Sequence, residues 1–215
     1  MSEVDASRDP SPTVDELPLL GEVFAIELAN SHYRGDHDDL DFLADADAVA
    51  TWFAHAPAAA GVTVPRPLPT DAVAALRRVR DATRLLLGQA ADDRRSPAAA
   101  GAAEVLHSAS RRAAGHLALD VGHDGAPAWH LHHDGSDTDV LVAATASRCI
   151  LFLGGDDVGR VRRCARAGCP MFFVQRHRAR RFCHDSCAHT TRQARYYRSM
   201  VRPRRARPAD PASGP

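Results

Sequence analysis

The chain has no lysine and no long apolar run. The second absence argues against a membrane-spanning protein. All 27 basic residues are arginine, a bias that genome composition produces and that carries little functional weight. The longest apolar run, residues 140–153, is interrupted by Arg148 and is shorter than the roughly 20 residues that cross a bilayer. No basic segment followed by an apolar one opens the chain, so we expect neither a signal peptide nor an anchor. We therefore expect a cytoplasmic protein without a membrane partner.

The motifs of common catalytic sites are also missing. The sequence has no glycine-rich phosphate loop, no nucleophile elbow and no HExxH pattern. No activated nucleophile or pair of carboxylates stands out, so we expect no catalytic residues and predict that the chain is not an enzyme.

Cysteine is scarce, but four of the five cysteines lie close together as C-x4-C, a gap and C-x3-C. Structural Zn(II) takes four thiolates from two such close pairs. We predict one Zn(II) per chain, in a closed site without an open position for substrate, held by Cys164, Cys169, Cys183 and Cys187. Disulfides fit poorly with an odd cysteine count and no secretory signal, and the usual bacterial iron–sulfur spacing differs.

The residues around the cysteines predict the shape of this finger. Gly168 allows a tight turn between the first pair. The apolar residues 171–174 indicate a strand, and residues 176–181 are expected to form a turn and a returning strand. Cys183 and Cys187 are four residues apart, which places them on one face in the first turn of a helix. The predicted fold is a treble-clef-like finger of knuckle, β-hairpin and helix.

Net charge is zero, yet the two parts of the chain differ sharply in charge. Residues 1–159 contain 12 Arg and 25 Asp or Glu, whereas residues 160–215 contain 15 Arg and two acids. Such asymmetry indicates an acidic body with a basic end that binds nucleic acid. The candidate contact residues are Arg176, Arg178, Arg180, Arg181, Arg192, Arg195 and Arg198.

We expect four segments: a disordered leader (1–18), a mainly helical domain (19–158), the finger (159–200) and a disordered basic, proline-rich tail (201–215). Within the helical domain, apolar periodicity and capping residues predict helices over 19–32 and 45–53, from Thr70, from Ser96, and over 137–153. Alternation across 116–121 and 128–133 predicts one small hairpin. Cys149 is expected to be a buried small hydrophobe.

Three groups of polar residues in the helical domain could have either a structural or a binding role. We favour Asn30 as a helix-end bracket over a pocket residue. Arg77, Arg80 and Arg84 fit a solvated face paired with acids better than an anion site. The histidines of 130–133 fit a satisfied strand better than a metal site.

The finger resembles the CGNR zinc finger of bacteria, on the strength of residues 180–183, which read RRFC, and the C-x3-C spacing. The chain departs from the signature itself, because Ala188-His189-Thr190 stands where the family has Gly-Asn-Arg. Gln175 also stands where the family usually has an acid.

The preceding domain resembles the helical ABATE domain at short stretches that occur in the expected order: residues 26–31, 76–80, 104–107 and 143–153. The two resemblances together imply a stress-linked transcription regulator. We therefore expect a DNA-binding regulator whose helical body senses a small-molecule effector or forms a homodimer. An RNA-binding module, and a protein-interaction module in which zinc is purely structural, remain alternatives.

Overall fold

The computed structural model describes residues 19–34, 39–56, 59, 62–122 and 125–201. Its elements in chain order are α1 (Phe24–Asn30), β1 (His32–Arg34), β2 (Asp39–Asp41), α2 (Ala46–His55), α3 (Thr70–Asp92), α4 (Ala99–Ser110), β3 (Ala114–Val121), β4 (Pro127–Asp134), α5 (Asp137–Leu153), the 3-10 helix η3 (Asp156–Arg160), β5 (Val161–Arg163), β6 (Phe172–Val174) and α6 (Asp185–Val201). The fold is mainly helical with small antiparallel strand pairs, as predicted. The predicted leader, and the tail from residue 202, lie outside the described residues.

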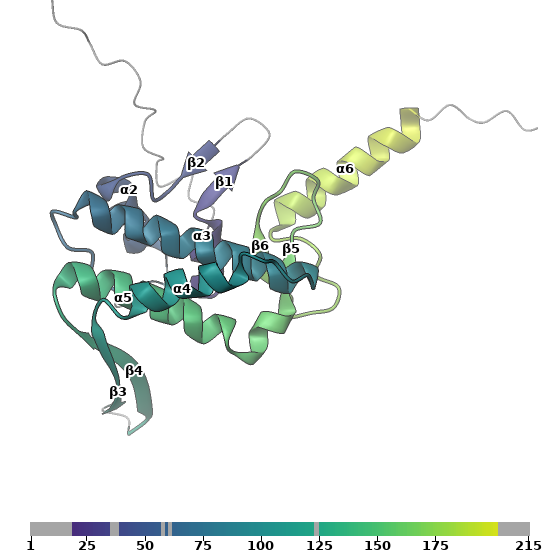
Figure 1. The fold of residues 1–215 in the computed structure, drawn as a ribbon. Coiled ribbons are helices and arrows are strands. Elements are labelled where there is room, and N and C mark those ends of the chain that lie inside the picture. Colours follow the sequence, from purple (N-terminus) through teal and green to yellow (C-terminus); the bar gives the residue numbers. More distant parts are fainter. Residues whose placement is uncertain (1–18, 35–38, 57–58, 60–61, 123–124, 202–215) are drawn as a thin grey trace, which may run out of the picture.

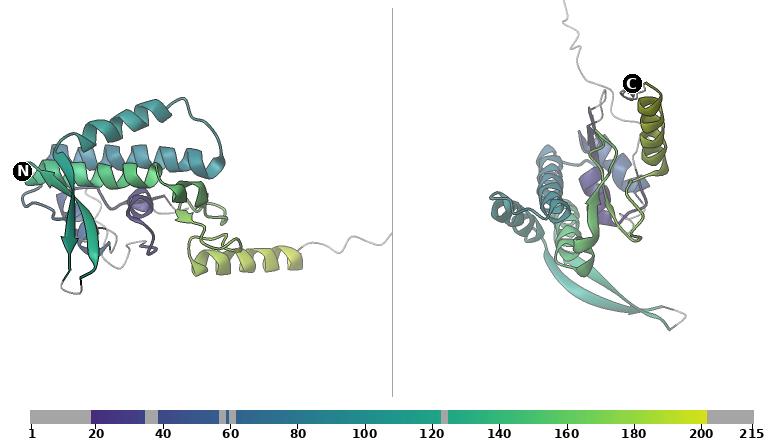
Figure 2. Two further views of the ribbon diagram at one scale, coloured as in Figure 1. Left: turned by 90° about the horizontal axis from the view of Figure 1, so that it is seen from below. Right: turned by 90° about the vertical axis from the view of Figure 1, so that its right-hand side faces the viewer.

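Helices α3, α4 and α5 lie side by side and form the body (Figure 1). The β3–β4 hairpin projects from one end of this body and α6 from the other, as two further views confirm (Figure 2). No helix among the described residues is both long and apolar enough to cross a membrane.

The main core lies between the body helices and the short α1 and α2. Helix α3 begins at Thr70 as predicted and buries Val73, Leu76 and Val79 on one face. This face meets Trp52 of α2, whose helix begins after Asp45, because the Asp45 carboxylate accepts a hydrogen bond from the Ala48 N–H. The periodic apolar stripe thus supplies the packing that stabilises the helix.

The first helix is shorter than predicted. Helix α1 covers Phe24–Asn30 only, and the antiparallel strands β1 and β2 follow it. The Ser31 hydroxyl donates to the Leu28 carbonyl and closes the helix end. Apolar spacing alone does not reveal that the helix ends at Asn30, because polar residues at positions 31 and 32 also fit the polar face of a longer helix.

The predicted hairpin and the last body helix are confirmed. Strands β3 and β4 pair in register with Leu119 opposite Trp129. Helix α5 begins at Asp137 after the N-cap Ser136 and ends at Gly154. Helix α4 begins at Ala99, three residues after Ser96.

The strand pairing of the finger differs from the prediction. Strand β6 (Phe172–Val174) pairs with β5 (Val161–Arg163), which precedes the first cysteine. Residues 176–182 form turns and bends without a returning strand. Strand β5 was missed because it is three residues long and two of them are arginine, which obscures the alternation that marks a strand.

Candidate zinc centre and basic finger

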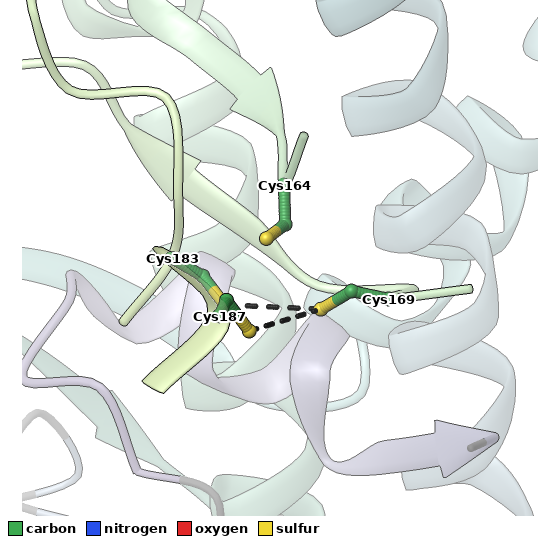
Figure 3. A group of neighbouring side chains, drawn as sticks. All are labelled: Cys164, Cys169, Cys183 and Cys187. Carbon is green, nitrogen blue, oxygen red and sulfur yellow. Dashed lines mark hydrogen bonds between the residues drawn. The ribbon is translucent and has the colours of Figure 1, made fainter. Parts of the chain in front are cut away.

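Four cysteine side chains converge at the base of the finger (Figure 3). The sulfur atoms of Cys164, Cys169, Cys183 and Cys187 all lie within 4.8 Å of one another. The Sγ–Sγ distances are 3.8 Å for Cys169–Cys183, 3.6 Å for Cys183–Cys187 and 4.0 Å for Cys187–Cys169. A tetrahedron with Zn–S bonds of about 2.3 Å has S–S edges of about 3.8 Å, so the cluster has the size of a Zn(II) site.

The donor set has the chemistry of a zinc site as well. Hydrogen bonds from neighbouring thiols hold the pKa of Cys164 below its ordinary value. Donation to Cys164 in turn raises the pKa of Cys169 to about 11. A thiolate at Cys164 thus makes ionisation of its neighbour Cys169 unfavourable unless a cation compensates the charge, and Zn(II) supplies that charge. The four cysteines form one zinc site, and because all four positions are taken by protein, its role is structural.

Local backbone geometry places the ligands. Gly168 has φ of 78°, which gives the left-handed turn that brings Cys169 back towards Cys164. The Cys164 N–H donates to the Met171 carbonyl at 2.9 Å and so ties the knuckle to the start of β6. Helix α6 begins at Asp185, so Cys187 lies in its first turn while Cys183 precedes it.

Arg180 is half-buried and makes most of its contacts within the finger. Its guanidinium donates to the carbonyls of Val174, Phe182 and Cys183 and lies 4.6 Å from the ring centroid of Phe173. Its Nη1 also forms a 2.6 Å ion pair with Glu22, whose side chain is 3% exposed. These contacts occupy its donors, so Arg180 belongs to the scaffold that supports the zinc ligands.

The other predicted contact residues keep their side chains free for a partner where the structure describes them. Arg176, Arg178, Arg181 and Arg192 are exposed and form no ion pair with any residue that the structure describes. The side chains of Arg195 and Arg198 lie outside the described part of α6. The finger therefore turns at least four guanidinium groups towards solvent.

Asn30 joins the body to the finger. Its Nδ2 donates to the Phe172 carbonyl at 2.9 Å, and its Oδ1 accepts from the Phe172 N–H at 2.9 Å. The side chain is buried and acts as a neighbouring strand would, pairing both backbone groups of a β6 residue. The expectation that Asn30 brackets its own helix end is wrong, because its amide groups are taken by a residue 142 positions away.

Further contacts extend this junction, which we call the seam. Arg84 donates to the Ala29 carbonyl and to the Pro170 carbonyl. Arg163 forms three hydrogen bonds with the Asp92 carboxylate, at 2.8, 3.1 and 3.0 Å, and this hydrogen bonding holds the pKa of Asp92 below its ordinary value.

A shared apolar cluster lies beneath these polar contacts. It is made of Ile26, Ala29, Leu87, Val161, Phe172 and Val174, which come from α1, α3, β5 and β6. The finger is thus packed onto the body, and the predicted boundary near residue 158 crosses a continuous core.

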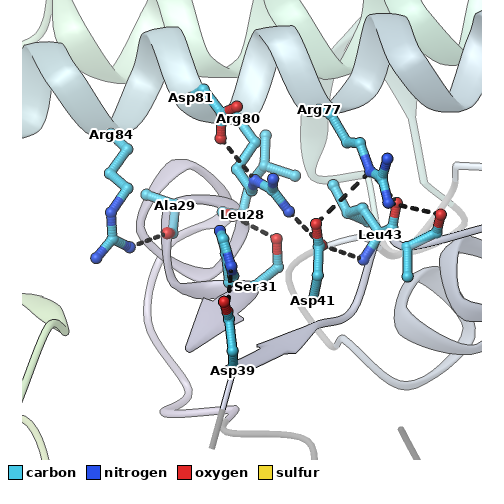
Figure 4. A network of polar contacts seen from close by, with 12 residues as sticks. Leu28, Ala29, Ser31, Asp39, Asp41, Leu43, Arg77, Arg80, Asp81 and Arg84 are labelled. Atoms are coloured by element: carbon cyan, nitrogen blue, oxygen red, sulfur yellow. Dashed lines mark hydrogen bonds and ion pairs between the residues drawn. The ribbon is translucent and has the colours of Figure 1, made fainter. Parts of the chain in front are cut away.

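Two arginines of α3, Arg77 and Arg80, hold the β1–β2 region against the helix (Figure 4). Arg80 is 3% exposed and pairs with Asp41 and Asp81. Arg77 donates to the Leu43 and Ala44 carbonyls at 2.7 and 2.6 Å. The expected pairing with acids is confirmed, but the expected solvated face is wrong for Arg80, because β2 and the loop after it cover this part of α3.

Two other predictions about the body are confirmed. Cys149 is fully buried in α5, and burial raises the pKa of its thiol to about 12, so it is neither ligand nor nucleophile. His130 and His132 lie on an exposed strand and pair with Asp120 and Asp134, as expected of a satisfied, solvent-facing strand.

Sequence reasoning missed Glu22 and the role of Asn30. Both flank an apolar helix that reads as ordinary core, and their partners are over 140 residues away. The available signal is an acid and an amide at the two ends of a short stretch that is apolar except for Glu27, where buried polar groups must find partners.

The fold and the cysteine cluster together define a zinc-finger protein with a helical partner domain. Residues 160–199 match the model of the CGNR zinc finger. Residues 22–156 match the ABATE model, described as "Putative stress-induced transcription regulator", and because this match covers more than half of the chain, the protein belongs to the ABATE family. Both predicted resemblances are confirmed, and neither family is an enzyme family. No curated protein matches the chain.

Proposed function

We propose that this protein is a DNA-binding transcription regulator whose zinc-stapled finger contacts the phosphate backbone. The observation that carries the proposal is a set of exposed arginines that form no ion pair with the described residues, on a protein whose first 159 residues are acidic. These arginines are Arg176, Arg178, Arg181 and Arg192. Guanidinium groups bind phosphate oxygens with paired hydrogen bonds, and their field attracts a polyanion. Membership of a regulator family supports the same conclusion.

The finger's construction supports a folded contact surface rather than a loose basic tail. Arg180 and the zinc ligands fix the loop that carries Arg176, Arg178 and Arg181, and the Gln175 side chain donates to the Arg180 carbonyl at 2.8 Å within it. A fixed loop loses less conformational entropy on binding than a flexible one. Arg195 and Arg198 would extend the contact along α6.

The test is a salt titration of binding to mixed-sequence duplex DNA, followed by fluorescence anisotropy. The variant carries Arg176→Gln, Arg178→Gln and Arg181→Gln. The control removes three exposed arginines from the body, with Arg78→Gln, Arg94→Gln and Arg95→Gln, and so changes net charge equally. We expect the finger variant to lower the slope of log affinity against log salt by about 2 to 3, whereas the control leaves it nearly unchanged.

Equal losses in the two variants would show that only net charge matters, and would refute a contact by the finger. Tighter binding to a structured RNA at the same salt would favour the RNA-binding alternative, because A-form helices are contacted through shape and backbone. No salt-dependent binding to either polyanion would leave the protein-interaction alternative.

A further inference from the structure

The β3–β4 hairpin has two chemically different faces. Cross-strand partners lie on the same face of an antiparallel pair, so the register places three apolar pairs together: Leu117 with Leu131, Leu119 with Trp129, and Val121 with Pro127. The opposite face carries His116, His130, His132 and Asp120. A sheet with one apolar face normally packs that face against a core.

Here that face is open to solvent. Leu117, Leu119, Val121 and Trp129 are 64–71% exposed, and with Leu151 of α5 they are the exposed large hydrophobic side chains of the described residues. Together these five side chains present on the order of 400–500 Å² of apolar surface. The largest apolar patch on a soluble protein is often a functional surface.

A groove continues the face towards the body. Its volume is about 780 Å³, and it lies between the hairpin and α5. Trp129, Leu131, Val140, Ala144 and Leu151 form the apolar part of its lining, and a polar part is formed by Asp120, His130, His132, His133, Asp137 and Arg148. The Nε2 of His133 lies 3.3 Å from the Ser147 hydroxyl of α5 and fixes the hairpin base. The same chain therefore carries a projecting apolar strand and a partly apolar groove that could receive one.

Charge argues against nucleic acid or an anionic membrane as the occupant. Residues 114–134 contain three aspartates and no arginine. The acids of the polar face are paired within the hairpin, as in His130–Asp120 at 3.2 Å and His132–Asp134 at 3.4 Å. The apolar face therefore has no excess charge that would repel an identical face, and a second copy of the chain is a suitable partner.

We propose that this apolar face and the groove beside α5 form a dimerisation surface that packs against the same surface of a second copy of this chain. Two copies would bury about 900 Å² from the exposed apolar side chains alone, and the surrounding polar and backbone surface brings the total to the 1,200 Å² or more of specific interfaces. The contact is isologous, with each hairpin covering the other copy's groove.

The position of the hairpin leaves the fingers accessible in such a dimer. It projects from the end of the body opposite α6 (Figures 1 and 2). Dimerisation and nucleic-acid contact thus use separate surfaces, and the dimer does not depend on the proposed function.

The test measures the molar mass of the full-length, zinc-loaded protein by sedimentation velocity over a dilution series. The variant carries Leu119→Thr and Trp129→Thr on the apolar face. The control carries His116→Thr and Ala118→Thr, two neighbouring residues of the polar face on β3 that do not line the groove. Threonine suits strands, so both variants should retain the hairpin. We expect a wild-type dimer, at least a hundredfold weaker dimerisation in the apolar-face variant, and little change in the control.

Tryptophan fluorescence gives a second readout. Trp52 is 1% exposed and Trp129 is 64% exposed, so iodide quenches mainly Trp129. We expect quenching to fall as the protein concentration rises. A wild-type protein that remains monomeric up to about 100 µM, with Trp129 fully quenchable, would overturn the proposal and indicate a different partner for this face. A dimer equally stable in both variants would overturn it as well.

Discussion

Two groups of arginines in this chain have opposite surroundings. In α3, Arg77, Arg80 and Arg84 are directed inwards to carboxylates and backbone carbonyls of the body and of the finger's first residues. In the finger, Arg176, Arg178 and Arg181 are exposed without ion pairs among the described residues. The difference shows that the packing partner of each segment decides what an arginine does, because an unpaired carbonyl or carboxylate nearby takes its donors.

Arg180 sharpens this comparison. It stands in the same loop as the exposed arginines, yet it behaves like those of α3, since Glu22 and three carbonyls surround it. An arginine-rich stretch therefore contains both scaffold and contact residues. Substitutions at residues of each kind should separate the two roles.

The largest effect should come from the zinc ligands. Structural zinc sites contribute on the order of 10 kcal/mol to folding, and the finger's own apolar cluster contains little besides the cysteines, Met171 and Phe173. We expect Cys183→Ser with Cys187→Ser to lower zinc content from one ion per chain to none, by elemental analysis, and to make residues 160–194 sensitive to protease. Cys149→Ala, which alters the buried cysteine of α5, should retain the ion. Loss of zinc from that control would contradict the assignment of ligands.

Arg80 and Arg176 test the comparison directly. Arg80→Ala removes a buried side chain and leaves half-buried Asp41 with only the more distant Arg77, at 3.6 Å, as its cationic partner. We expect the free energy of unfolding to fall by about 3–5 kcal/mol. Arg176→Ala removes an exposed side chain and should change stability by less than about 0.5 kcal/mol. Urea denaturation of both variants provides the measurement. Similar losses would mean that the two groups do not differ as their surroundings indicate.

Asn30→Ala should have a somewhat smaller effect, which tests the seam. The substitution leaves the buried N–H and carbonyl of Phe172 without partners, at a cost of about 2–4 kcal/mol. Hydrogen exchange should show faster exchange in β6 and the knuckle than in α3. Uniform destabilisation of body and finger, without a local increase at β6, would contradict this role.

Asp41 gives the smallest predicted effect, a dependence on pH. Burial alone would raise its pKa, but the Arg80 hydrogen bond and charge hold that pKa below its ordinary value of 3.8. Its stabilising contribution is therefore present above pH 3.8 and is lost as the pH falls through the lower, folded-state pKa. Asp41→Asn should flatten the decline of the thermal midpoint below pH 3.8. An unchanged decline would show that other carboxylates account for it.

Much of the fold could be predicted from sequence because local signals were strong. Helix α3 follows from Thr70 and its apolar stripe, and α5 follows from Ser136 before it. The β3–β4 hairpin follows from the alternation of side chains on both sides of residues 122–126. The zinc ligands followed likewise from spacing, and their sulfur atoms converge as expected.

What could not be predicted depends on contacts distant in sequence. Strand β5 exists because β6 pairs with it across the knuckle. Asn30 and Glu22 take their roles from β6, and Arg180 takes its role from Glu22. No local pattern encodes such partners, so Arg180 could not be separated from its exposed neighbours before the fold was known.

The central claim is that zinc presents the exposed arginines of the finger to DNA. The most direct measurement compares DNA affinity across a salt series for the wild-type protein and for the variant with Cys183→Ser and Cys187→Ser. We predict that the zinc-free variant binds more weakly and with a shallower salt dependence, because its loop arginines no longer act together. Identical affinity and slope for the two proteins would contradict the claim.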